Sequence, residues 1–188
     1  VKVSGRNVVV GTPEGCCFDR RNTDITRSGA VMLAAACSLT ASDPLATPPR
    51  PVKGFIKVFV ANEGAPDDLV TLEQFFRTPA GTATLAKSGT PKDVSLLSTR
   101  RSNDVLFAKI RDRGEPEAPG ISSLFWRAFF ETNDRLVGLA LISFSGANPS
   151  DTEALNYLND FANRTRRLNP VAAPPPAPLP PDGTNTEG

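Results

Sequence analysis

The stretch from residue 93 to residue 145 most constrains the fold, because apolar runs alternate there with short turn sequences. We expect strands at 93–99, 104–111, 121–131 and 135–145, and the last of these has the strongest strand pattern. Strands that follow one another so closely usually pair antiparallel through hairpins. The sequence therefore predicts an antiparallel sheet. Its connections are expected at residues 100–103, 111–120 and 133–134.

Three segments nearer the start of the chain also have the composition of strands. Residues 7–10 predict a short strand. Residues 30–37 are apolar but too few for periodicity to separate helix from strand, and the preceding Ser-Gly pair favours a buried strand. Residues 52–61 are rich in β-branched and aromatic side chains. Residues 11–19, in contrast, are rich in turn formers and exclude a long helix.

Two short helices are expected between the early and late strands. Either Asp67 or Asp68 can cap the first helix. Its apolar face recurs at spacings of three and four residues and comprises Leu69, Leu72, Phe75 and Phe76. The Thr78-Pro79 pair predicts a second helix that ends at Gly89, so that the two form one bent helical unit.

A longer helix is expected near the end of the chain. The pattern from Ser150 to Glu153 is a capping box, in which each side chain binds a free amide at the helix start. Pro170 stops this helix. Residues 170–188 hold a proline run and cannot bury enough apolar area to order themselves. We therefore predict one α+β domain over residues 1–169 and a disordered Pro-rich tail over 170–188.

The composition excludes several kinds of site. The absence of histidine removes Ser-His-Asp and Cys-His catalysis and mixed Cys/His zinc sites. The glycines match neither common phosphate-binding pattern. The net charge is +1, and the arginines at 164, 166 and 167 are typical of a helix C-terminus. We predict no catalytic, cofactor or metal site, no nucleic-acid partner and, without a run of about 18 apolar residues, no membrane span.

The three cysteines indicate a disulfide. Cys16 and Cys17 are adjacent and rarely bond to each other, so one of them is expected to pair with Cys37. Such a bond is typical of exported proteins. The first residue is Val1, which is consistent with either a removed signal peptide or a shortened chain. The competing interpretation is a reactive thiol at Cys16, in a tight turn with Arg20 and Arg21 nearby in the sequence.

An aromatic cluster offers the one candidate ligand groove. Phe125, Trp126 and Phe129 lie close together in the sequence and could line such a groove. The alternative is that these side chains, alternating along a strand, pack against a helix.

The order of elements resembles the α+β sandwich of the photosystem PsbP proteins and the Mog Ran-binding proteins. Three segments further resemble an uncharacterised family of exported bacterial proteins. They are Pro13–Asp19 with Cys37, Phe75–Gly81, and Leu136–Phe144 with the helix after it. The family typically has Gly-Tyr-Cys where this chain has Gly15-Cys16-Cys17, so the resemblance implies a disulfide between Cys17 and Cys37 and leaves Cys16 over.

These observations predict a non-catalytic exported protein, periplasmic or otherwise in the envelope, that binds an unknown protein or small molecule. The alternative function is a thiol-dependent enzyme or redox protein that uses Cys16. The two differ in one property, a free thiol of low pKa.

Overall fold

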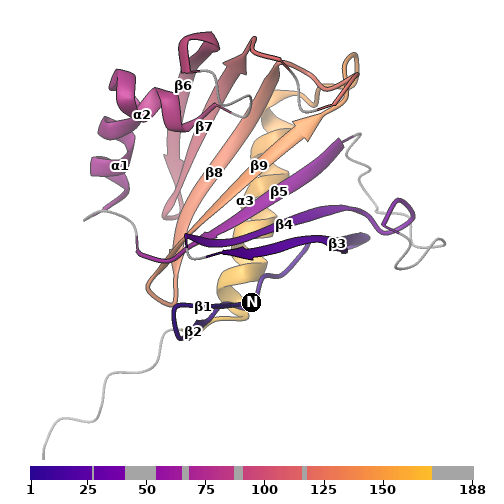
Figure 1. Cartoon of the computed structure of the whole chain (residues 1–188), viewed down its shortest axis with the longest axis vertical. Coiled ribbons are helices and arrows are strands. Elements are labelled where there is room, and N and C mark those ends of the chain that lie inside the picture. The colour runs from indigo at the N-terminus through magenta and orange to yellow at the C-terminus, as the bar shows by residue number, and fades with distance from the viewer. Residues whose placement is uncertain (27, 41–53, 65–67, 87–90, 116–117, 171–188) are drawn as a thin grey trace, which may run out of the picture.

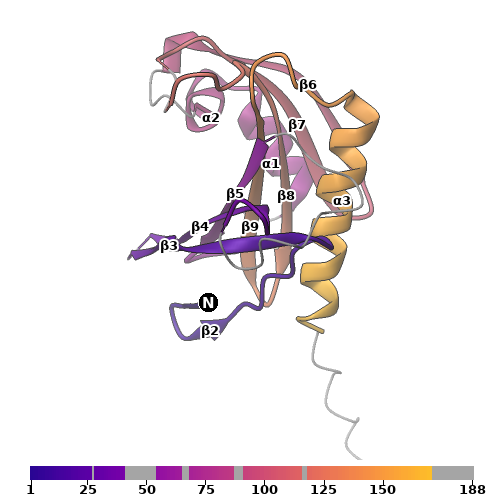
Figure 2. The ribbon, with the colours of Figure 1, turned by 90° about the vertical axis from the view of Figure 1, so that its right-hand side faces the viewer.

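The computed structural model describes residues 1–26, 28–40, 54–64, 68–86, 91–115 and 118–170. Its centre is a strongly twisted antiparallel sheet with helices on both faces (Figures 1 and 2). The expectation of an α+β fold built on an antiparallel sheet is therefore confirmed. The tail beyond Pro170 lies outside the described residues. No helix in the described ranges is both long and apolar enough to cross a membrane.

The sheet has seven strands, and each neighbouring pair is antiparallel. In spatial order they are β3 (Cys16–Thr26), β4 (Gly29–Ala36), β5 (Gly54–Ala61), β9 (Arg135–Ser143), β8 (Leu124–Thr132), β7 (Val105–Asp112) and β6 (Val94–Ser102). A separate small hairpin joins β1 (Lys2–Val3) to β2 (Arg6–Asn7), and the 3-10 turn η1 (Pro91–Asp93) precedes β6. The central position of β9 agrees with its strongly apolar sequence.

Two hairpins at one end of the sheet share the same turn chemistry. The central residues Asn103 and Asp104 have φ values of 50° and 55°, and Asn133 and Asp134 have 48° and 56°. Two-residue hairpin turns require positive φ, which Asn and Asp adopt more readily than other non-glycine residues. The second turn lies where the sequence predicts it. The first turn was predicted at residues 100–103. It lies at Asn103 and Asp104 instead, because β6 continues to Ser102.

The helix α3 (Asp151–Arg167) covers one face of the sheet (Figure 2). It begins at the predicted capping box, with the Ser150 hydroxyl and the Glu153 carboxylate each bound to the other residue's backbone amide. It ends at Arg167, shortly before Pro170, the residue that was predicted to stop it. Its buried side chains are Ala154, Leu158, Phe161, Ala162 and Thr165, and they join the larger apolar core.

The opposite face carries α1 (Leu69–Phe76) and α2 (Pro79–Thr84) over the half of the sheet that holds β6, β7 and β8 (Figure 1). Asp68 is the N-cap of α1, and its carboxylate accepts the Thr71 amide at 2.7 Å. The predicted apolar face holds for Leu72 and Phe76, but Phe75 is 41% exposed. The second helix ends at Thr84 rather than at Gly89, which lies outside the described residues.

The N-terminal third differs most from expectation. Residues 7–10 were predicted to form a strand, but only Arg6–Asn7 does so, in β2. The predicted turn region at 11–19 contains the start of β3, which has eleven residues and is mostly exposed after Asp19. The strand is at the edge of the sheet, where one neighbour suffices and polar side chains are tolerated. It therefore lacks the apolar alternation that would have identified it.

Candidate functional site

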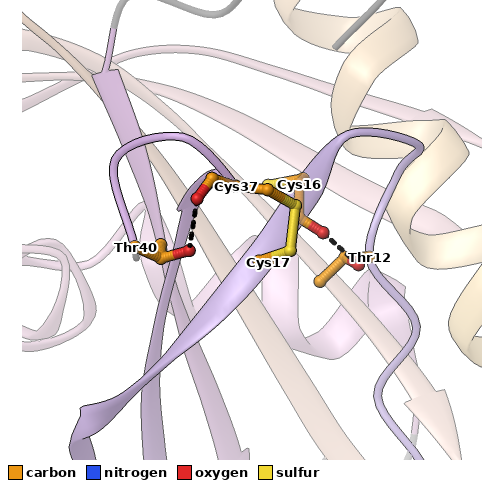
Figure 3. Close-up of a disulfide and its surroundings, with 5 residues drawn as sticks. All are labelled: Thr12, Cys16, Cys17, Cys37 and Thr40. Atoms are coloured by element: carbon orange, nitrogen blue, oxygen red, sulfur yellow. Dashed lines mark hydrogen bonds between the residues drawn. A yellow bond between two sulfur atoms is a disulfide. The ribbon is translucent and has the colours of Figure 1, made fainter. Parts of the chain in front are cut away.

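The disulfide joins Cys17 of β3 to Cys37, just after β4, with an S–S distance of 1.97 Å and Cα atoms 4.7 Å apart (Figure 3). This is the pairing that the family resemblance implies. Backbone bonds support it, because the Cys37 amide donates to the Gly15 carbonyl at 2.9 Å. The Thr40 hydroxyl donates to the Cys37 carbonyl at 3.1 Å. The bond therefore anchors the edge strand β3 and the chain after β4 at one point.

The remaining thiol, Cys16, is buried in the core on the α3 side of the sheet. It is the first residue of β3, and alternation along the strand turns its side chain away from that of Cys17. Burial raises the pKa of the Cys16 thiol, while a hydrogen bond with Tyr157 opposes this shift. The adjoining cavity is only about 10 Å³, which is about the volume needed for one water.

These features are the opposite of those expected for a reactive thiol. A nucleophilic cysteine is accessible and has its pKa lowered by positive charge or by a helix N-terminus. Burial also raises the pKa of Tyr157, so the phenol next to Cys16 stays protonated at neutral pH and cannot serve as a base. The position predicted for a reactive Cys16 is therefore a packed interior site.

The three aromatic residues considered for a groove do not share one face of the sheet, so they form no common groove and instead pack against helices, as the alternative expected. Trp126 packs in the core beneath α3, whereas Phe125 and Phe129 pack in the second core beneath α1 and α2. All three side chains are buried. The physical reason is the two-residue period of a strand, which sends Trp126 to one face of β8 and Phe125 and Phe129 to the other.

The structure instead forms a wide groove at the end of the sheet, with a volume of about 780 Å³. We call it the end groove. It is lined by the start of α1 (68–70), the turn after β6 (101–104), the end of β8 (131–132) and the end of α3 with the residues after it (166 and 169–170). Four elements that are distant in sequence meet there, and the volume is within the usual range for small-molecule sites.

The end groove arises from unequal hairpin lengths. Pairing between β7 and β8 ends at Leu106 and Phe129, but β8 continues to Thr132. In Figure 1 the β8–β9 hairpin accordingly extends past the β6–β7 hairpin. The β6–β7 hairpin turns at Asn103 and Asp104, so the end of β8 has no neighbouring strand on the β7 side. The difference in length between the two hairpins leaves this part of β8 beside open space.

Five charged side chains line the end groove, three carboxylates and two guanidinium groups. Arg101 is already paired with Glu73, 2.9 Å away. Arg166 donates to the Asn103 carbonyl at 2.6 Å and to the Asp104 carbonyl, and its guanidinium lies 5.4 Å from the centre of the Phe130 ring. Burial lowers the pKa of Arg166. Both cations are thus held in place by the protein itself.

The far wall of the end groove is fixed by Asn169, which is 5% exposed. Its amide group donates to the Val9 and Thr165 carbonyls, both at 2.7 Å, and its oxygen accepts from the Val9 amide and from Asn133. This one side chain joins α3, the N-terminal segment and the β8–β9 turn. The wall is therefore formed before any ligand arrives.

Nothing in the described ranges gathers three acidic, cysteine or histidine side chains closely enough to hold a metal ion. Comparisons with protein families, with curated proteins and with solved structures found no match to this chain. The end groove was not predicted from the sequence. The two Asn-Asp turns were visible signals of hairpin ends, but nothing in the sequence indicated that the helix ends would meet them.

Proposed function

We propose that this chain is a non-catalytic, exported binding or accessory protein of the bacterial envelope with a PsbP/Mog-like sandwich, and that it binds its ligand in the end groove. The observation that carries the proposal is the groove itself, a concavity of about 780 Å³ whose two guanidinium groups are held by neighbouring residues. The disulfide supports an oxidising compartment, because such bonds persist outside the cytoplasm.

The alternative of a thiol-dependent enzyme has less support. Its only candidate nucleophile in the described ranges is Cys16, since Cys17 and Cys37 are bonded to each other. The burial of Cys16 and its raised pKa both disfavour a thiolate at neutral pH. A binding protein needs no reactive thiol.

The proposal can be tested by mapping ligands with amide NMR signals of the isotope-labelled protein. A mixed library of small charged, neutral and peptide compounds is titrated, and binders are expected to shift signals from residues 101–104 and 131–132. Ser102→Trp should block binding because this exposed residue lines the groove. Ser95→Trp is the matched control, at the other end of β6 and also exposed.

Two results would contradict the proposal. Binders that map elsewhere and tolerate Ser102→Trp would remove the groove from the function. Turnover of a substrate that is lost on changing one polar cluster would show an enzyme. The same titration distinguishes these outcomes, because a substrate signal is replaced by a product signal over time.

A further inference from the structure

The half of the sheet that holds β3, β4 and β5 has a helix on only one of its faces. On that face, alternate residues of the strands, such as Met32 and Val58, join the core beneath α3. On the other face, α1 and α2 lie over β6, β7 and β8, and neither extends across β3–β5 in Figure 1. We call this second surface of β3, β4 and β5 the open face. A sheet normally buries its apolar faces under another layer.

The open face is apolar along β4 and β5. Strand alternation turns toward it the residues that lie between those of the α3 core. The register places Leu33 beside Lys57 and Val31 beside Phe59. Val31, Leu33 and Phe55 are partly exposed, and Phe59 is 38% exposed. Aliphatic and aromatic side chains therefore form one continuous surface, with a single lysine in its middle.

Positive charge borders this apolar surface. A hollow of about 370 Å³ is lined by residues 21–24, 31–33 and Lys57, so that two cations meet one carboxylate, Asp24. Arg21 is exposed, and its guanidinium group makes no hydrogen bond or ion pair within the ranges that the structure describes. The carboxylate of Asp19 accepts instead from the backbone amide of Arg21 at 2.9 Å and from the Asn22 side chain at 2.7 Å. The hollow thus favours a negatively charged partner.

The dimensions of the open face match one helix. Three strands about 4.8 Å apart span roughly 10–15 Å, and a helix with its side chains is about 10–12 Å wide. The eight residues of β4 and of β5 extend over roughly 25 Å, which is between four and five helical turns. A second copy of the described part of the chain has no helix to offer, because α1, α2 and α3 already pack on their own sheet.

We infer that the open face binds an amphipathic, acidic helix of a partner protein. The apolar stripe of that helix would lie on Val31, Leu33 and Phe59, as in other complexes in which a helix docks on an apolar surface. Carboxylates beside the stripe would pair with Arg21 and Lys57. A basic helix of the same shape would meet two cations and one carboxylate. The open face is separate from the end groove, so this inference can fail while the proposed function holds.

The test uses two synthetic 18-residue peptides, added separately to the isotope-labelled full chain. Both carry leucines at helical spacing, flanked by glutamates in one peptide and by lysines at the same positions in the other. The glutamate peptide is expected to shift the amide signals of residues 31–35 and 55–59 and to leave those of 101–104 and 131–132 unchanged. The lysine peptide should bind at least about fivefold more weakly, because complementary charge selects the partner.

Two variants with matched controls locate the contact. Leu33→Ala should weaken binding of the glutamate peptide about tenfold through lost apolar contact, whereas Leu97→Ala, at an exposed position of β6, should not change it. Arg21→Gln should weaken it about threefold, as expected for an exposed ion pair. The same change at the exposed Arg100 of β6 should have no measurable effect. Each variant should keep the amide signals of the wild type away from its own substitution.

Three results would overturn the inference. Equal affinities for the two peptides, with equal effects of Arg21→Gln and Arg100→Gln, would show that charge does not select the partner. Signals of residues 31–35 and 55–59 that shift when the protein alone is concentrated would show that a second copy covers the open face. If neither peptide shifts these signals, the open face is no docking surface for a helix, and the end groove keeps its own test.

Discussion

The Trp126 indole N–H donates to the Asp151 carboxylate at 3.3 Å, at the junction between β8 and the first turn of α3. The Lys109 ammonium group donates to the two oxygens of the same carboxylate at 2.7 and 2.8 Å. It also lies 5.7 Å from the centre of the Trp126 ring. One carboxylate therefore connects two neighbouring strands to the helix that covers them.

Asp151→Asn should reduce the free energy of unfolding by about 0.5–1 kcal/mol, because the carboxylate is half exposed and solvent screens the pair. Hydrogen bonding from Lys109 is the main reason that the pKa of Asp151 is lowered from 3.8. A lowered folded-state pKa stabilises above 3.8, and this stabilisation disappears as the pH falls further. The difference between wild type and variant should therefore vanish in acid. Denaturant unfolding followed by Trp126 fluorescence measures it, and a difference that grows in acid would contradict the assignment.

Glu73→Gln should destabilise the protein by about 1–2 kcal/mol, because this carboxylate joins α1 to β6. It accepts from Thr99 at 2.5 Å and pairs with Arg77 at 2.8 Å and Arg101 at 2.9 Å. The Thr99 hydrogen bond is the main cause of the lowering of the Glu73 pKa from 4.5. The destabilisation by Glu73→Gln should therefore be full above pH 4.5 and become smaller in acid. The exposed Glu63→Gln is the control and should have little effect. Equal melting temperatures for the two variants would refute the role of Glu73.

Reduction of the disulfide should cost about 3 kcal/mol, as expected for a crosslink that closes a loop of 20 residues. Urea unfolding with and without reductant measures this difference. The double variant Cys17→Ala/Cys37→Ala should have the stability of the reduced wild type and should not respond to reductant. A response in the double variant would mean that the effect arises elsewhere.

Gly81→Ala should destabilise by about 2 kcal/mol or more through a clash with the backbone. A Cβ atom at Gly81 would lie 1.9 Å from the Phe75 carbonyl oxygen, at the corner between α1 and α2. Gly64→Ala is the matched control, since its nearest contact would be an ordinary 3.5 Å. Calorimetric melting of both variants measures the contrast, and similar melting temperatures would show that the corner can relax.

Local sequence patterns predicted the elements that are set by local physics. Asp68 and the capping box at Ser150 fixed the starts of two helices, because caps satisfy amides within one turn. The late strands were predictable from apolar runs between turns. The polar edge strand β3 was not, because its stability comes from pairing with β4 rather than from its own apolar side chains.

The candidate site was less predictable than the fold. The aromatic residues allowed either a groove or packing against a helix, and alternation along β8 sends Trp126 and Phe125 to different cores. The end groove depends on how far two hairpins extend and where two helix ends lie. Those quantities arise from tertiary packing, so neither Glu131 nor Thr132 had a local pattern that pointed to a site.

Counting thiols by intact mass tests our proposal that this is an exported protein with one disulfide and no reactive thiol. Protein from its native source is alkylated when folded, when denatured, and when denatured and reduced. We expect no rapid labelling of the folded protein, one labelled thiol after denaturation, and three after reduction. Three thiols before reduction would contradict export to an oxidising compartment. Rapid labelling of Cys16 in the folded protein at neutral pH would favour the alternative function, a thiol-dependent enzyme.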